Sequence, residues 1–143
     1  MLRNSLAIFA LAGLASVPVA ALAGTVTLVA TLNGANETGG GDTDGTGSFS
    51  GEIDDETGDV CYVLSADNIG KPVAAHIHAG AAGTDGAPVV TLEVTGPDGD
   101  MCLAAEPDAL KPIVAAPEGY YVNVHTADFP KGAVRGQLAK KKP

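Results

Sequence analysis

The sequence predicts an all-β domain: an antiparallel β-sandwich with Greek-key-like connections and about seven to eight strands. Short β-compatible segments recur at intervals of roughly 8–15 residues, each bounded by Gly, Asp, Asn or Pro. No apolar pattern with the helical period of 3.6 extends over the length of an ordinary helix. A small β-barrel is the alternative architecture, because closure of a sheet cannot be read from strand patterns.

The first 23 residues have the three parts of a secretory signal peptide. Arg3 is the only charged residue, residues 6–17 form an apolar core, and 21–23 end in a small-residue cleavage site. A membrane anchor is the alternative, but this apolar run is shorter than the ~18–20 residues that a span needs. We therefore expect cleavage after Ala23, a secreted or periplasmic mature chain, and no membrane insertion after processing.

Seven segments carry the strand signal. Residues 25–32 begin by alternating Thr with apolar side chains, and Phe49, Gly51 and Ile53 fall on one face of the next segment. Residues 54–58 then form the turn of a β-hairpin. The predicted strands are 25–32, 47–54, 59–65, 73–79, 88–95, 120–126 and 133–138.

The segments between these strands are turn-rich. Residues 104–114 have room for one helical turn, whose length Pro107 and Pro112 limit. The basic residues 140–143 follow the last strand and are expected to form a disordered tail. The remaining residues, 24–139, are predicted to form one domain. Gly- and Asp-rich loops are expected at 34–45, 80–86 and 96–100.

The charge of the chain limits its partners. There are 17 acidic residues against 8 Lys and Arg, and the formal net charge is -9. Nucleic acids and anionic lipid surfaces bind cationic patches, so neither is an expected partner. An acidic chain is instead suited to binding cations.

The two cysteines, Cys61 and Cys102, are predicted to form a disulfide. An even pair in an exported protein is typical of an oxidising compartment. Closing a loop of this length stabilises the fold by roughly 4 kcal/mol in the chain-entropy model. A free thiol pair and metal thiolates are the alternatives, and the absence of a C-x-x-C motif weighs against the second.

The three histidines are the most informative residues. His76 and His78 lie two apart in one predicted strand, so both side chains point to the same face, about 6.6–6.8 Å apart along the strand. His125 lies in a later strand and completes a three-imidazole set if the two strands are neighbours. Imidazole nitrogens bind Cu, Zn, Ni and Fe. Solvent-facing or hydrogen-bonded histidines are the alternative reading.

Four further residues are candidates for roles around this site. Asp85 and Asp128 lie in the loops after the histidine strands, and each is a candidate fourth ligand or hydrogen-bond partner of a ligand. Tyr121 and Asn123 alternate with His125 along its strand and share its face. We expect them to orient the His125 ring.

Several segments together resemble the CHRD domain, a family named after chordin and widespread in secreted bacterial proteins. They are L-N-G-A-N-E at 32–37, G-T-G at 45–47, A-H-I-H-A-G at 75–80, G-A-P-V-V at 86–90, Y-V-N-V-H-T at 121–126 and G-A-V-R-G-Q-L at 132–138. The resemblance covers residues 25–138 and implies a secreted all-β domain with a recurrent histidine set. Ala133 stands where the family usually has an acidic residue, at a position we expect on the surface or an edge.

Three functional hypotheses follow. The first is an exported metal-binding protein that holds copper, or zinc as the second choice, through His76, His78 and His125 for storage, delivery or electron transfer. The ligand pattern is similar to the copper half of Cu/Zn superoxide dismutase, but the bridging and zinc-side histidines have no counterparts here. The second is a structural or adhesive module of the cell envelope or exterior without metal. The third is a copper-dependent redox enzyme, which the lack of a recognisable acid–base pair disfavours.

Overall fold

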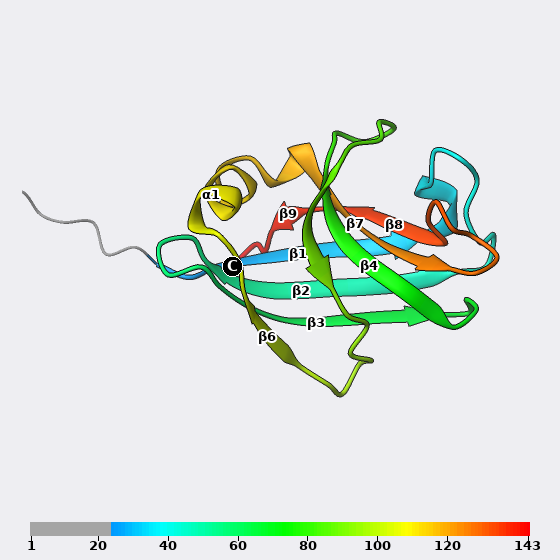
Figure 1. Ribbon diagram of the computed structural model, residues 1–143, viewed down its shortest axis with the longest axis horizontal. Coiled ribbons are helices and arrows are strands. Elements are labelled where there is room, and N and C mark those ends of the chain that lie inside the picture. Colours follow the sequence, from blue (N-terminus) through cyan, green and yellow to red (C-terminus); the bar gives the residue numbers. More distant parts are fainter. Residues whose placement is uncertain (1–23) are drawn as a thin grey trace, which may run out of the picture.

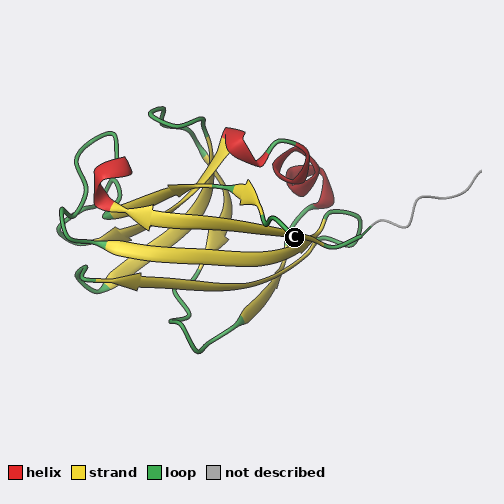
Figure 2. Ribbon diagram, turned by 180° about the vertical axis from the view of Figure 1, so that it is seen from behind, coloured by secondary structure: helices red, strands yellow, loops and turns green. Residues whose placement is uncertain are grey.

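The computed structural model describes residues 24–143, and the predicted signal peptide lies outside them. Strands dominate the regular structure of the described chain, which also has one α-helix and two 3₁₀ turns (Figures 1 and 2). The strands are β1 (Val26–Asn33), β2 (Thr46–Asp54), β3 (Asp59–Asp67), β4 (Pro72–Ala79), β5 (Pro88–Leu92), β6 (Met101–Ala104), β7 (Tyr120–Thr126), β8 (Val134–Gln137) and β9 (Ala139–Lys140). The helical elements are η1 (Gly34–Asn36), α1 (Pro107–Ala115) and η2 (Pro117–Gly119).

All nine strands belong to one sheet, in the order β5-β4-β7-β8-β1-β2-β3-β6, with β9 paired to β1. Every pairing is antiparallel. The sheet curls, so that β4 and β5 cross over β1, β2 and β3 (Figure 1). The predicted all-β antiparallel class is therefore confirmed. Two halves face each other as in a sandwich, while β1 connects them through hydrogen bonds to β2 and β8 as in a barrel.

The hydrophobic core fills the inside of the curl. Alternate residues of each strand point inward, as the period of two requires. In β4, for example, Ala75 and Ile77 are completely buried, whereas His76 between them and His78 after them lie on the outer face. The largest apolar side chains of this core are Phe49, Tyr62, Leu28, Leu32, Ile53, Leu64, Ile77, Leu110, Ile113 and Leu138.

The helix α1 is longer than the single turn that the sequence predicts. Pro107 occupies its first turn, where a missing N–H costs nothing, and Pro112 lies inside it. The helix continues because Leu110, Ile113 and Val114 are buried in the hydrophobic core. Tertiary burial therefore outweighs the local cost of Pro112.

Two short strands were not predicted, and a third is shorter than expected. Strand β6 pairs with the edge of β3, and β9 pairs with Leu28 and Val29 of β1. The start of the basic tail is thus part of the sheet, and the Lys141 amide also donates to the Thr27 carbonyl. Strand β5 ends at Leu92, because the following residues 93–96 leave β4 and bond instead to β3.

The predicted disulfide is present. Cys61 of β3 and Cys102 of β6 are directly paired across the two strands, with an S–S distance of 2.04 Å. The bond holds the short strand β6 on the edge of the sheet and closes a loop with a sequence separation of 41 residues. It thereby fixes the connection from β5 to α1.

We expect the double variant Cys61→Ser/Cys102→Ser to lower the free energy of unfolding by about 2–4 kcal/mol, because the unfolded chain regains the entropy of the open loop. Urea denaturation followed by circular dichroism measures this loss. The metal affinity of the folded variant should match that of the wild type, since both cysteines lie far from the histidines in the sheet order. An unchanged unfolding midpoint would contradict the prediction.

Within residues 24–143, no helix combines the length and the apolar character that crossing a bilayer requires.

Candidate metal centre

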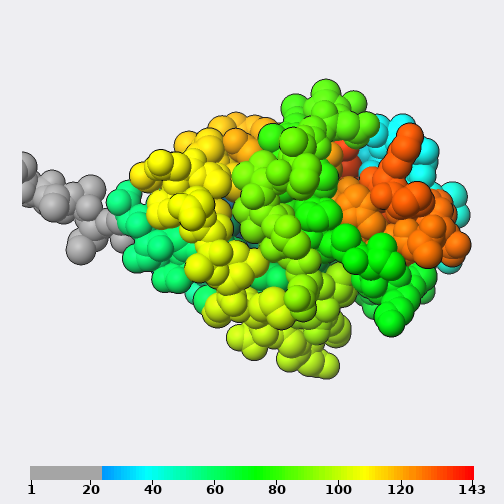
Figure 3. Space-filling view, in the orientation of Figure 1, coloured from blue at the N-terminus to red at the C-terminus, as the bar shows by residue number. Residues whose placement is uncertain are grey.

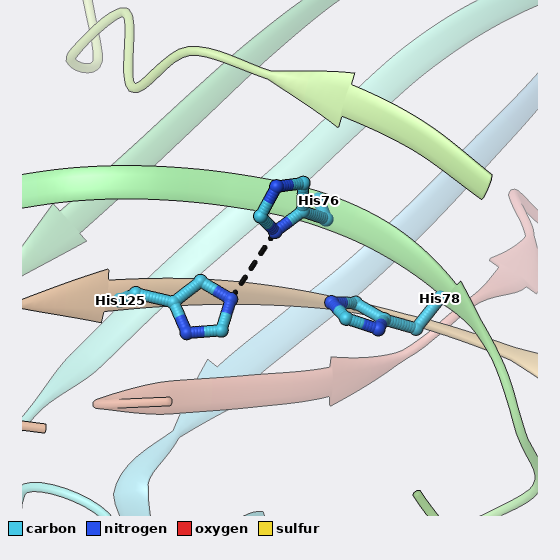
Figure 4. A group of neighbouring side chains, drawn as sticks. All are labelled: His76, His78 and His125. Carbon is cyan, nitrogen blue, oxygen red and sulfur yellow. Dashed lines mark hydrogen bonds between the residues drawn. The ribbon is translucent and has the colours of Figure 1, made fainter. Parts of the chain in front are cut away.

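The three histidines converge on the outer face of β4 and β7. These two strands are neighbours, and their register pairs Ala74 with His125 and His76 with Asn123. Side chains of directly paired residues lie on the same face of a sheet, so His125 stands diagonally beside His76. A register shift against β5 lies between Ile77 and His78, and such bulges re-aim side chains. Figure 4 shows the three rings turned toward one another.

The ligand nitrogens are close enough to share an ion. One nitrogen from each of His76, His78 and His125 lies within 4.8 Å of the other two. The shortest approach is 3.2 Å, between His76 Nδ1 and His125 Nε2 (Figure 4). The sequence-predicted histidines are thus brought together, as the pairing of their strands requires.

Backbone carbonyls select the tautomers of two of the rings. His78 Nδ1 lies 2.9 Å from the Gly86 carbonyl and His125 Nδ1 lies 3.1 Å from the Pro130 carbonyl. A carbonyl only accepts, so both Nδ1 atoms carry the proton, and the Nε2 atoms keep their lone pairs. This N–H···O=C arrangement is typical of histidines that bind metals.

The free lone pairs point into the cluster. His78 Nε2 is buried and has no hydrogen-bond partner. His125 Nε2 accepts a hydrogen bond from His76 Nδ1. His76 Nδ1 therefore carries a proton when no ion is bound to the three rings. An ion that replaced this proton would receive one lone pair from each ring.

The local electrostatics favour neutral imidazoles. Burial lowers the pKa of His76 below its ordinary value of 6.5, and the neighbouring His125 and His78 lower it further. Burial also lowers the pKa of His125, opposed by the hydrogen bond to the Pro130 carbonyl. Neutral imidazole is the form that binds a metal, so these two shifts favour the metal-binding form of His76 and His125 at neutral pH.

A stack of three side chains supports His78 from one side. The Tyr121 ring lies parallel to the His78 ring, with centroids 4.9 Å apart and an interplanar angle of 5°. The Arg135 guanidinium lies over the Tyr121 ring, 3.3 Å from the centroid of that ring. Arg135 is only 2% exposed. Tyr121 therefore orients His78 rather than His125, the ring that we expected it to orient.

Arg135 also holds the loop that contacts His78. Its Nη2 donates to the carbonyls of Ala81 and Thr84, both in the loop between β4 and β5. The same loop carries Gly86, whose carbonyl accepts from His78. One buried cation thus fixes both the ring plane and the tautomer of His78. No sequence pattern predicted this role of Arg135.

The two candidate aspartates do not join the three nitrogens. Asp85 instead accepts from Arg135 at 3.2 Å and from the Thr38 hydroxyl at 2.6 Å. It therefore connects the loop after β4 to the loop after η1. In the described residues, the group of mutually close ligand atoms contains the three histidines and neither Asp85 nor Asp128.

A cavity of about 380 Å³ adjoins the cluster, with His78 in its wall. Asn123 lines it too and is 2% exposed, so this residue faces the cavity beside the histidines. Glu37, which directly follows η1, lines the cavity as well. Burial raises the pKa of Glu37 to about 7, against the lowering effect of the Arg135 charge. No sequence pattern predicted that Glu37 would lie beside the histidines.

Ala133 is completely buried, which corrects the expectation that it lies on the surface or an edge. Its amide donates to the Val124 carbonyl, and its carbonyl accepts from the Asp42 amide. The loop after η1 is therefore tied down onto the start of β8 at this point. In Figures 1 and 3 the two loops concerned, 34–45 and 127–133, lie side by side at one end of the molecule.

Comparison with known proteins identifies one family. The CHRD domain model matches residues 28–138, which include every strand that carries the histidine cluster. No curated protein and no solved structure matches the chain.

Proposed function

The chain belongs to the CHRD domain family, and from this premise we propose that it is an exported protein that binds one copper ion through His76, His78 and His125. The observation that carries the proposal is the convergence of three imidazole nitrogens, two of which have their tautomers selected by backbone carbonyls. Zinc is the second choice of ion.

The donor set supports copper. All three ligands are neutral nitrogen donors, and imidazole sites follow the Irving–Williams order, in which Cu²⁺ binds more tightly than Zn²⁺. The ligands come from two paired strands of a sheet, so their positions are set before the ion arrives. A site of this kind is suited to storing copper, to delivering copper or to transferring electrons through the bound copper ion.

Export is supported by two features. The leader pattern of residues 1–23 is that of a secretory signal, and the Cys61–Cys102 disulfide is of the kind that persists in oxidising compartments. The proposed location is the periplasm or the exterior of the cell.

Calorimetric titration of the purified metal-free chain with Cu(II), and separately with Zn(II), tests the proposal. We expect one ion per chain, tighter binding of Cu(II), and nitrogen hyperfine splitting in the electron paramagnetic resonance spectrum. Absence of stoichiometric binding would overturn the proposal and favour a structural or adhesive module. Turnover of superoxide or another oxidant by the copper-loaded chain would favour a redox enzyme.

Copper affinity should fall as the pH is lowered, and the fall should begin below 6.5. The folded chain lowers the pKa values of His76 and His125 below that value, so protons compete with the ion only in more acidic solution. Each imidazole that protonates costs up to about tenfold in affinity per pH unit. Titrations between pH 5 and 8 measure the profile. A decline that is already complete at about pH 7 would contradict it.

A further inference from the structure

The cavity beside the histidines contains more unsatisfied acceptors than one ion can explain. In the described chain, three buried side-chain atoms have no hydrogen-bond partner: Glu37 Oε1, His78 Nε2 and Asn123 Oδ1. All three residues line the same cavity. Buried polar groups are normally paired, so such a cluster requires an explanation. A metal ion on the imidazoles satisfies His78 and leaves the other two.

The two remaining atoms are both acceptors. The Asn123 amide group lies 3.5 Å from the Lys131 carbonyl and also hydrogen-bonds the Glu37 carboxylate, which leaves Asn123 Oδ1 without a partner. The carboxylate of Glu37 packs against the Cα of Gly132, where any side chain would collide with it. Oxygen acceptors that face one cavity call for an occupant with hydrogen-bond donors.

The wall of the cavity holds two acidic side chains, Glu37 and Asp85, and one basic side chain, Lys131, and in the described residues Glu37 forms no salt bridge. The guanidinium of Arg135 is directed to Asp85 and to backbone carbonyls, so it is not available to Glu37 as a hydrogen-bond donor. Lys131 is exposed and forms no salt bridge in the described residues. Hydrogen bonds to a carboxylate are stronger when the donor is charged.

The cavity has the size and lining of a small-molecule site. Its volume of about 380 Å³ is at the lower end of the range for ligand pockets. Glycines form much of the wall, so backbone rather than side chains bounds the space. They are Gly39, Gly40, Gly86 and Gly132.

We propose that this cavity binds a small organic ammonium ion, with Glu37 Oε1 and Asn123 Oδ1 accepting hydrogen bonds from the ammonium group. The site is separate from the proposed copper site, but His78 and the two residues that orient it, Tyr121 and Gly86, also line the cavity. It does not require a bound metal.

Nuclear magnetic resonance titration of the metal-free chain with ethanolamine at pH 8 tests the proposal. We expect shifts of the Asn123 side-chain amide and of the glycine amides in the cavity wall, with a Kd on the order of millimolar. Ethylene glycol and acetate serve as neutral and anionic probes. The proposal would be overturned if ethylene glycol bound as tightly as ethanolamine, or if acetate bound more tightly. Resonance shifts spread evenly over the acidic surface would also overturn it.

Two variants and a matched control identify the site. Glu37→Gln preserves the shape of the side chain and should weaken ethanolamine binding about tenfold or more, because the charged hydrogen bond is lost. Asn123→Leu should do the same. Glu52→Gln removes an exposed carboxylate on β2 and should leave the Kd unchanged. Equal binding by wild type and Glu37→Gln would overturn the proposal.

Copper titration of the same Glu37→Gln variant separates this proposal from the previous one. Glu37 is not among the mutually close ligand atoms, so its copper affinity should match that of the wild type. Copper binding without ethanolamine binding would refute the ammonium site alone. Ethanolamine binding without copper binding would refute the copper site alone.

Discussion

Replacement of His78 by alanine is expected to weaken Cu(II) binding by more than about 100-fold. Loss of a group that merely supports a metal ligand costs about 10–100-fold in affinity, and loss of the ligand itself costs more. His78 is the ring whose lone pair is buried, unpartnered and directed into the cluster, so no other described side chain replaces it. Calorimetric titration of the variant measures the effect.

Two further variants make this result interpretable. Val73→Ala changes an exposed residue, 64% accessible, on the same strand β4 and should bind copper as the wild type does. His125→Ala removes a second ligand from the more accessible side of the site and should also abolish tight binding, without disturbing the stack on Tyr121. Copper affinity within about threefold of wild type in both histidine variants would refute a three-histidine centre.

The strands of the sheet were predictable where a buried face imposes alternation. Residues such as Phe49 and Ile53 in β2 point inward, and their burial produces the alternation of apolar and polar residues that predicts the strand. Strands β6 and β9 were not predictable, because they are short and form through pairing with edges that the local sequence does not encode. The length of α1 depended likewise on a tertiary surface for Leu110 and Ile113.

The site was predictable only in its histidines. An H-x-H pair places two imidazoles on one face by strand geometry alone, and the remaining histidine lies on a strand that pairs beside it. The groups that orient the rings are harder to find. Two are backbone carbonyls, of Gly86 and Pro130, and a carbonyl has no residue signature. Arg135 acts through a stack whose members are far apart in sequence.

The cavity was not predictable at all, for the same reason. It forms where the loop after η1, the loop after β4 and the loop before β8 meet over the outer face of the sheet. Loop packing depends on individual long-range hydrogen bonds, such as that from the Thr38 hydroxyl to Asp85. Composition identified these segments only as polar and glycine-rich, and left their contacts open.

Arg135→Met is expected to lower the free energy of unfolding by about 3–6 kcal/mol. The guanidinium donates to two loop carbonyls, and hydrogen bonds from a charged group contribute about 1.5–3 kcal/mol each. Its ion pair with Asp85 adds little, because the aspartate side chain is 74% exposed and solvent screens the charge. Methionine fills much of the space but leaves the carbonyls of Ala81 and Thr84 without their donor.

The same substitution should also weaken copper binding at the metal site. Without Arg135 the loop that carries Gly86 is no longer anchored, and His78 loses the carbonyl that selects its tautomer. We therefore expect copper affinity to fall about 10–100-fold in the folded variant. Urea denaturation and copper titration of one preparation give both values. Lys111→Met removes an exposed ion pair with Asp108 and should change the stability by less than about 1 kcal/mol. A stable Arg135→Met variant with wild-type copper affinity would show that His78 is oriented without the stack.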